Sequence, residues 1–128
     1  MKLLTGINIQ FPISRSILDG SKVVETRTYP IPEAYLGKDL VIVETPGKLG
    51  RFKARAVAIV RFGACFQYRT AKEFYDDIDR HQVAPSSPWA WSDERPKWGW
   101  TIDEIRPLST SFEIKKRIGI RYTKDISV

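Results

Sequence analysis

The stretch Gly20-Ser21-Lys22-Val23-Val24-Glu25-Thr26-Arg27 decides how the rest of this sequence is interpreted. Its β-branched residues favour a β-strand, and Gly20 permits a tight turn before that strand. Because side chains on a strand alternate between its two faces, Glu25 and Arg27 are expected on the same face. The long arm of Lys22 can bend over either side of the turn. The stretch is therefore either a surface strand with solvated charges or a polar site at a turn–strand junction.

A second motif lies about 70 residues further along the chain. It consists of Trp98-Gly99-Trp100-Thr101-Ile102 followed by Ile105-Arg106-Pro107-Leu108. The first motif, G-x-K-x-x-E-x-R after a short helix, resembles the signature of ASCH domains, which belong to the PUA-like superfamily. The second is similar to the aromatic-Gly-Trp strand and the Arg-Pro-Leu exit near the end of many ASCH chains. The resemblance covers the whole chain and implies a single ASCH/PUA-like domain over 1–128.

The composition is that of one globular domain with a net positive charge. The chain has 128 residues, of which 42% are hydrophobic and 28% charged, which is ordinary for a folded domain. Its 21 Lys and Arg residues exceed its 15 Asp and Glu residues, so the net charge is +6. A basic surface favours a polyanionic partner, most simply nucleic acid.

Cysteine and histidine are too few for several kinds of site. One cysteine, Cys65, excludes an intrachain disulfide and suits a reducing cytoplasm. With one histidine, His81, the chain cannot assemble a typical zinc site, and we expect neither metal nor cofactor. We interpret Cys65 as a small buried apolar residue and His81 as a partner for a helix C-terminus. Apolar runs are too short to span a membrane, and the sequence leaves the oligomeric state open.

Hydrophobic periodicity and turn residues predict the elements. A capping box at Thr70-Ala71-Lys72-Glu73 predicts a helix that ends near His81, and a shorter helix begins at Pro12 and ends before Gly20. In the clearest strand, from Phe52 to Phe62, every second residue faces inward, and three of these residues are alanines. The expected strands cover 3–9, 22–28, 40–43, 52–62, 97–105, 112–118 and 119–126, with a turn at 109–111.

These elements predict an α+β domain with mostly antiparallel strands. The alanines on the inner face of 52–62 leave room for the opposite wall of a small barrel. The ASCH resemblance implies the same architecture, a small PUA-like β-barrel with about two helices covering it.

Basic and aromatic side chains supply candidate contacts for nucleic acid. Lys115, Lys116 and Arg117, together with Lys53 and Arg55, are candidates for contacts to phosphates, or else they are solvated strand faces. Four tryptophans are interpreted mainly as core. Trp100 is the preferred residue for base stacking, because it belongs to the second motif, and a tryptophan from the loop 84–96 would close the other side.

Three functions fit the sequence. The first is an RNA- or nucleotide-binding module, in which Lys22, Glu25, Arg27 and Trp100 contact the ligand. The second is a hydrolase of RNA or of an acylated cytidine, a ribonuclease or an N4-acylcytidine amidohydrolase, in which Lys22 and Glu25 are catalytic. The amidohydrolase branch of the family carries threonine where this chain has Glu25, and a Lys22–Glu25 ion pair would keep the lysine charged. The third is a protein-binding adaptor with an aromatic contact surface.

Overall fold

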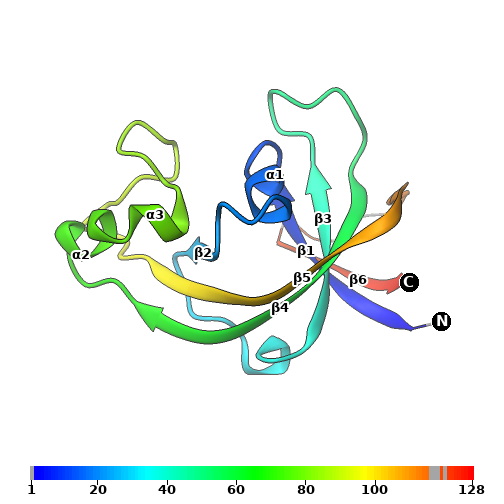
Figure 1. The fold of residues 1–128 in the computed structure, drawn as a ribbon, viewed down its shortest axis with the longest axis horizontal. Helices are drawn as coiled ribbons and strands as arrows, with labels where there is room; N and C mark the ends of the chain where they lie inside the picture. Colours follow the sequence, from blue (N-terminus) through cyan, green and yellow to red (C-terminus); the bar gives the residue numbers. More distant parts are fainter. Residues whose placement is uncertain (1, 116–118, 120) are drawn as a thin grey trace.

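One mixed β-sheet of six strands organises the fold. The computed structural model describes residues 2–115, 119 and 121–128. The strands follow the spatial order β2-β5-β4-β3-β1-β6, and among them β1 and β3 pair in parallel while the other neighbours are antiparallel (Figure 1). Their bounds are β1 Leu3–Gln10, β2 Val24–Arg27, β3 Asp39–Thr45, β4 Arg55–Gln67, β5 Trp98–Glu113 and β6 Tyr122–Ser127.

The α+β class and the mostly antiparallel sheet are confirmed, whereas the predicted closed barrel is not. In the described residues β2 and β6 are the two edges of an open sheet, and each pairs with one neighbour. Closure would require a ladder between those edge strands, which are only four and six residues long.

A long antiparallel ribbon made by β4 and β5 replaces several shorter predicted elements. Its register extends from Gln67 opposite Trp98 to Arg55 opposite Glu113. The predicted turn at 109–111 is therefore wrong, because these residues continue β5 rather than reverse it. Of the predicted strand 112–118, Phe112 and Glu113 are the end of β5, while 116–118 lie outside the described residues. β4 begins and ends later than 52–62.

Register shifts in β4 also divide its predicted inner face between two core clusters. Ala58, Val60 and Phe62 pack in the main cluster. Ala56 packs instead in a second cluster with Val41. A shift between Ala56 and Ala58 interrupts the alternation of side chains, which the sequence pattern alone could not reveal.

In the described part of the chain, three short α-helices and one 3₁₀ turn accompany the sheet, whereas the sequence predicts about two helices. Gly20 follows the first helix with a φ of +84°, as expected for a residue that ends a helix. Thr70 accepts a hydrogen bond from the Glu73 amide, which confirms the threonine half of the capping box. The expected long helix that this motif begins is divided at Asp77 into two pieces, α2 and α3. The bounds are α1 Ile13–Leu18, η1 Glu33–Tyr35, α2 Ala71–Asp76 and α3 Ile78–His81.

The two ends of the described chain lie side by side (Figure 1). The Lys2 amide donates to the Val128 carbonyl over 3.1 Å, and the Val128 amide donates to the Lys2 carbonyl over 2.9 Å. These bonds extend the pairing of β1 with β6 by one step beyond Leu3 and Ser127.

Candidate functional site

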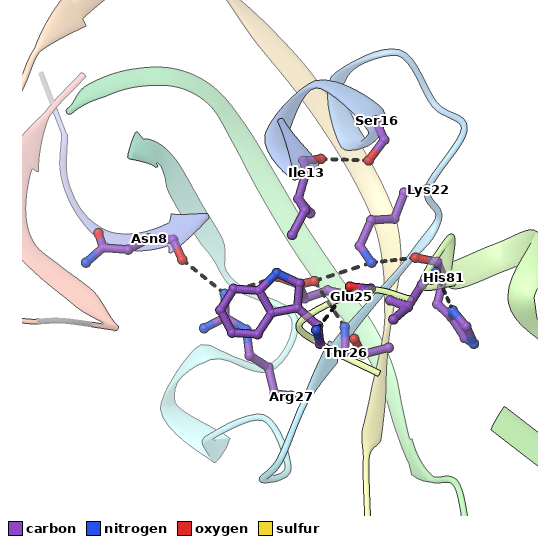
Figure 2. A network of polar contacts seen from close by, with 11 residues as sticks. Asn8, Ile13, Ser16, Lys22, Glu25, Thr26, Arg27 and His81 are labelled. Carbon is purple, nitrogen blue, oxygen red and sulfur yellow. Dashed lines mark hydrogen bonds and ion pairs between the residues drawn. The ribbon is translucent and has the colours of Figure 1, made fainter. Parts of the chain in front are cut away.

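Lys22, Glu25 and Arg27 form one buried cluster of charges. The Lys22 ammonium lies 3.7 Å from one Glu25 carboxylate oxygen, and the Arg27 guanidinium donates a 3.0 Å hydrogen bond to the other. Figure 2 shows the three side chains directed toward one another. Lys22 is 3% exposed and Glu25 5% exposed, so the predicted polar site is buried and does not form a solvated strand face.

Local backbone structure explains why the three side chains converge. After the turn at Gly20, the Lys22 amide donates to the Ser16 carbonyl over 2.9 Å, which holds the start of the motif against α1. The edge strand β2 then pairs with β5, with Glu25 opposite Trp100. The alternation of side chains on β2 directs Glu25 and Arg27 to the same face, as predicted from the sequence.

The helix α3 supplies the other partner of Lys22. The ammonium donates a 2.5 Å hydrogen bond to the His81 carbonyl. The His81 ring is fully buried, accepts the Val83 amide at Nδ1 over 2.9 Å and contacts the Phe74 carbonyl through Nε2 over 2.6 Å. These partners require the neutral tautomer protonated at Nε2. His81 therefore lies at a helix C-terminus, as predicted, but its ring is neutral and bonds to local backbone groups, so it is not a charged partner of the helix dipole.

Burial and mutual attraction act in opposite directions on the charges of this cluster. Burial lowers the pKa of the Lys22 ammonium, and the Glu25 carboxylate only partly offsets this effect. Burial also disfavours the Glu25 carboxylate, but the charges of Arg27 and Lys22 outweigh it and lower the pKa of Glu25. Burial lowers the pKa of His81 too, and the nearby Lys22 charge adds to this. The Lys22 charge is therefore retained at an energetic cost.

Arg27 links the cluster to β1 and to the core. Its guanidinium donates a 3.1 Å hydrogen bond to the Asn8 carbonyl, and its Cζ atom lies 5.6 Å from the centre of the Trp100 ring. The Trp100 indole is 0% exposed and donates to the Tyr29 carbonyl over 3.1 Å. Its ring face cannot receive a base, so the predicted stacking role of Trp100 is wrong and the residue supports Arg27 from the core.

The cluster opens into a cavity of about 530 Å³. Trp89, from the loop 84–96, lines this cavity and is 45% exposed. The exposed Arg121 lines it as well. Lys22, Arg27 and Arg121 against Glu25 give the lining a net charge of +2, counted as three minus one. The remaining lining comes from the chain segments 8–10, 25–27 and 45–47 and from Ile13 and Val83.

This arrangement offers directed donors and one acceptor at the floor of a concave site. An ammonium has three N–H donors and a guanidinium has five. Lys22 directs donors to His81 and Glu25, and Arg27 bonds both of its partners through one Nη2 atom, so both cavity-lining side chains have N–H groups beyond these bonds. Such a floor can bind carbonyl or phosphate oxygens, and the Glu25 carboxylate can accept from a ligand N–H.

Comparison with solved structures identifies the architecture. The ASCH protein from Zymomonas mobilis matches with a TM-score of 0.70 and 14% sequence identity, over 94% of this chain and 85% of that chain. Two single-residue variants of that protein give TM-scores of 0.72 and 0.67 at 14% and 11% identity, over 94% and 96% of this chain and 86% and 90% of theirs. This chain has the ASCH fold. No protein-family model and no curated protein sequence matches it.

Within this ASCH fold, the predicted phosphate contacts lie outside the cavity. Lys53 and Lys115 are exposed and do not line it. Arg55 is occupied elsewhere: its guanidinium donates to the buried Glu44 carboxylate over 2.9 Å and lies 4.0 Å from the centre of the Phe52 ring. Two further predicted contacts, Lys116 and Arg117, lie outside the described residues.

Several residues at the ASCH-fold cavity had only weak signals in the sequence. Arg121 ends the basic stretch that begins at Lys115, and nothing in the sequence distinguishes it from the other basic residues there. Trp89 belongs to the loop from which a tryptophan was expected to close the site, and it lies at the cavity wall. Asn8 interrupts an apolar run, and its side chain bonds to Gly119 and Thr123 beside the cavity. A single polar residue in a strand does not by itself indicate that the residue lies beside a binding cavity.

Over 2–115, 119 and 121–128, the histidine, cysteine and carboxylate side chains form no group that could hold a metal ion. Within the same described residues, no helix is long and apolar enough to cross a membrane.

Proposed function

We propose that this chain is an ASCH-family module that binds RNA or a nucleotide, with a base in the cavity beside Lys22, Glu25 and Arg27. One observation carries the proposal: a buried charged cluster forms the floor of a cavity that has an exposed tryptophan in its wall. A cavity of about 530 Å³ lies in the usual range for small-molecule sites.

Each part of the cavity matches one part of a nucleotide. The Lys22 and Arg27 donors suit carbonyl oxygens on a base edge, and the Glu25 carboxylate suits a base N–H. The Trp89 ring offers a stacking surface, which accepts any base because every base has a π-face. Arg121 is exposed and suits a phosphate, which a guanidinium binds in a bidentate manner.

Longer RNA would extend beyond the cavity. We propose that the exposed Lys53 and Lys115 contact its phosphates, and that Lys116 and Arg117, for which the sequence is the only support, do the same. We propose that this binding takes place in the cytoplasm, as the cysteine content suggests.

Titration calorimetry with the four nucleoside 5′-monophosphates tests the proposal. Trp89→Ala is expected to weaken binding about tenfold, which corresponds to the loss of one stacking contact. Phe112→Ala, which removes an exposed aromatic ring that does not line the cavity, serves as the control and should bind like the wild type. Failure of all four nucleotides to bind, or equal losses in both variants, would contradict the proposal.

A hydrolase is the second candidate, because Lys22 is a buried amine with a lowered pKa in a cavity. Such an amine is closer to acting as a proton acceptor at neutral pH than an exposed lysine. The test is turnover of single-stranded RNA and of N4-acylated cytidine by the wild type and by Glu25→Gln. If Glu25 acts as acid or base, the variant should lose about 10²–10⁴-fold in turnover while binding is retained. If the chain only binds, Glu25→Gln should hold an anionic ligand more strongly and distinguish bases less well.

For a protein-binding adaptor, the structure offers only a small exposed aromatic surface. Trp89 is exposed, Trp91 and Trp98 are partly buried, and Trp100 is fully buried. An aromatic docking surface made of all four residues is therefore not present.

A further inference from the structure

A second hollow of about 440 Å³ adjoins the cavity and shares Arg121 with it. Thr28 lines this hollow and directly follows β2, whose residues 25–27 line the cavity. Gln67 and Trp98, which lie opposite one another in the β4–β5 register, also line it. The loop that carries Trp89 returns to the sheet here and contributes Glu94 and Arg95.

Arg121 is held in place between the two hollows. Its guanidinium carbon lies 4.5 Å from the centre of the Tyr29 ring, in a cation–π contact. Its backbone carbonyl accepts the Asn8 amide of β1 over 2.9 Å. The side chain is exposed, so a ligand in either hollow can reach its remaining donors.

The two hollows repeat the same combination of groups. Each contains one tryptophan that is not fully buried, Trp89 in the cavity and Trp98 in the second hollow. Each carries a net positive charge, since Arg95 and Arg121 in the second hollow outnumber Glu94. An arginine between two aromatic sites matches the alternation of base, phosphate and base along a single strand.

We propose that the second hollow binds the nucleotide adjacent to the one in the cavity. The ligand is then a single strand of at least two linked nucleotides, with the connecting phosphodiester at Arg121 and the second base against Trp98. This inference rests on the proposed function, because it assigns a neighbour to a nucleotide in the first cavity.

A matched pair of ligands isolates the second site. Uridine 3′-methylphosphate carries one base and one phosphodiester, and uridylyl-(3′→5′)-uridine adds only the second nucleoside at the same charge. Calorimetry should show the dinucleotide binding about tenfold more tightly. The ratio of dinucleotide affinity to methyl-ester affinity is then measured for the adenosine pair and for the deoxyribose forms. A changed ratio would show that the base or the sugar contributes to binding at the second site.

Single-residue variants show which residues produce the tighter binding of the dinucleotide. Thr28→Trp, which fills the second hollow from an exposed position, should abolish the advantage of the dinucleotide and leave the affinity for the methyl ester unchanged. Arg95→Ala should weaken the dinucleotide about threefold to tenfold and spare the methyl ester, whereas Arg121→Ala should weaken both ligands. Arg51→Ala removes an exposed arginine that lines neither hollow and should change nothing.

The outcomes separate this inference from the proposed function. If the methyl ester binds and the dinucleotide gains nothing, the second subsite is refuted and the proposed function stands. The second subsite is also refuted, and the proposed function stands, if Thr28→Trp still binds the dinucleotide more tightly than the methyl ester. If no ligand binds to the wild type, both proposals fail together.

Discussion

The Lys22 ammonium donates a 2.5 Å hydrogen bond to the backbone carbonyl of His81, 59 positions later in the chain. This bond joins the turn before β2 to the C-terminal end of α3, where helix carbonyls lack partners within the helix. A cation there is also favoured by the helix dipole. The motif lysine is therefore positioned by a main-chain atom, and the side chain at position 81 has a separate structural role.

Lys22→Met is expected to change how stability responds to alkaline pH. In the folded state the pKa of Lys22 lies below the ordinary 10.5, so the unfolded state binds more protons between those two values. Stability contributed at this position therefore rises with pH through that window. Urea unfolding as pH approaches 10.5 from below should show this rise in the wild type and a smaller one in the variant. Lys38→Met, at an exposed position, is the control, and an identical rise in both variants would argue against the assignment.

Glu25→Gln is expected to flatten the acid limb of the stability curve. The folded pKa of Glu25 lies below the ordinary 4.5, so its contribution is complete above 4.5 and is lost as pH falls through the folded value. At pH 7 the variant leaves two buried cations without their carboxylate, which costs about 3–5 kcal/mol. Denaturant unfolding from pH 3 to 7 measures both effects. The exposed Glu33→Gln should follow the wild-type curve, and a wild-type acid slope in Glu25→Gln would show that another group is responsible.

Tryptophan fluorescence should report the ligand through Trp89 and not through Trp100. Trp89 is 45% exposed in the cavity wall, whereas Trp100 is 0% exposed. A stacked nucleotide is therefore expected to quench Trp89, and Trp89→Phe should remove the ligand-dependent change. Trp100→Phe should keep that change, although it loses the hydrogen bond to Tyr29. Quenching that persists in Trp89→Phe would move the base to another surface.

Salt dependence distinguishes the cavity from the outer basic residues. Each phosphate contact contributes about 0.7 to the slope of log affinity against log salt for a single strand. The double variant Lys53→Ala with Lys115→Ala should therefore reduce the slope by about 1.4 for a long single-stranded RNA and leave dinucleotide binding unchanged. An unchanged slope with long RNA would assign both lysines to the solvated surface.

Glu44→Gln is expected to destabilise the fold and to weaken binding indirectly. The buried Glu44 carboxylate accepts hydrogen bonds from Ser14 over 2.6 Å and from Arg15 over 2.8 Å, which hold α1 on the sheet, and a third from Arg55 over 2.9 Å. Loss of the charge should cost about 1.5–3 kcal/mol and should loosen Ile13, which lines the cavity. Thermal unfolding and nucleotide affinity measure the two effects. Arg15→Ala removes a half-exposed partner and should cost less than about 1 kcal/mol; an equal loss in both variants would contradict this ranking.

The sequence predicted the local structure around the charged motif because short-range rules decide it. The turn at Gly20, the period of two in β2 and the apolar face of α1 all depend on neighbouring residues. The resemblance to ASCH domains, carried by Lys22, Glu25 and Arg27 among others, is confirmed at the level of the fold. The position of Glu25 and Arg27 on one face followed from the same alternation of side chains, whereas Lys22 approaches Glu25 from the turn before β2.

Long-range pairing explains what the sequence did not predict. Ser109 and Thr110 have the composition of a turn, but pairing of the flanking residues with β4 keeps them extended. Trp100 belongs to a motif that suggested a ligand contact, yet its position on β5 opposite Cys65 places it in the core. Arg121 reaches the cavity only because β6, which follows it directly, pairs with β1. In this pairing Ile7 lies opposite Tyr122, which is 115 positions later in the sequence.

The paired chain ends allow the order of the strands to be changed while the charged cluster is kept in one segment. Because Lys2 and Val128 are joined by two backbone hydrogen bonds, a linker of a few residues would connect them directly. New ends can then be opened between Lys48 and Leu49, both exposed in the turn that precedes β4. In this circular permutant the chain would start with β4 and finish with β3, while Lys22, Glu25 and Arg27 stay in one uninterrupted segment. The site would then form in a chain whose synthesis begins at a different strand.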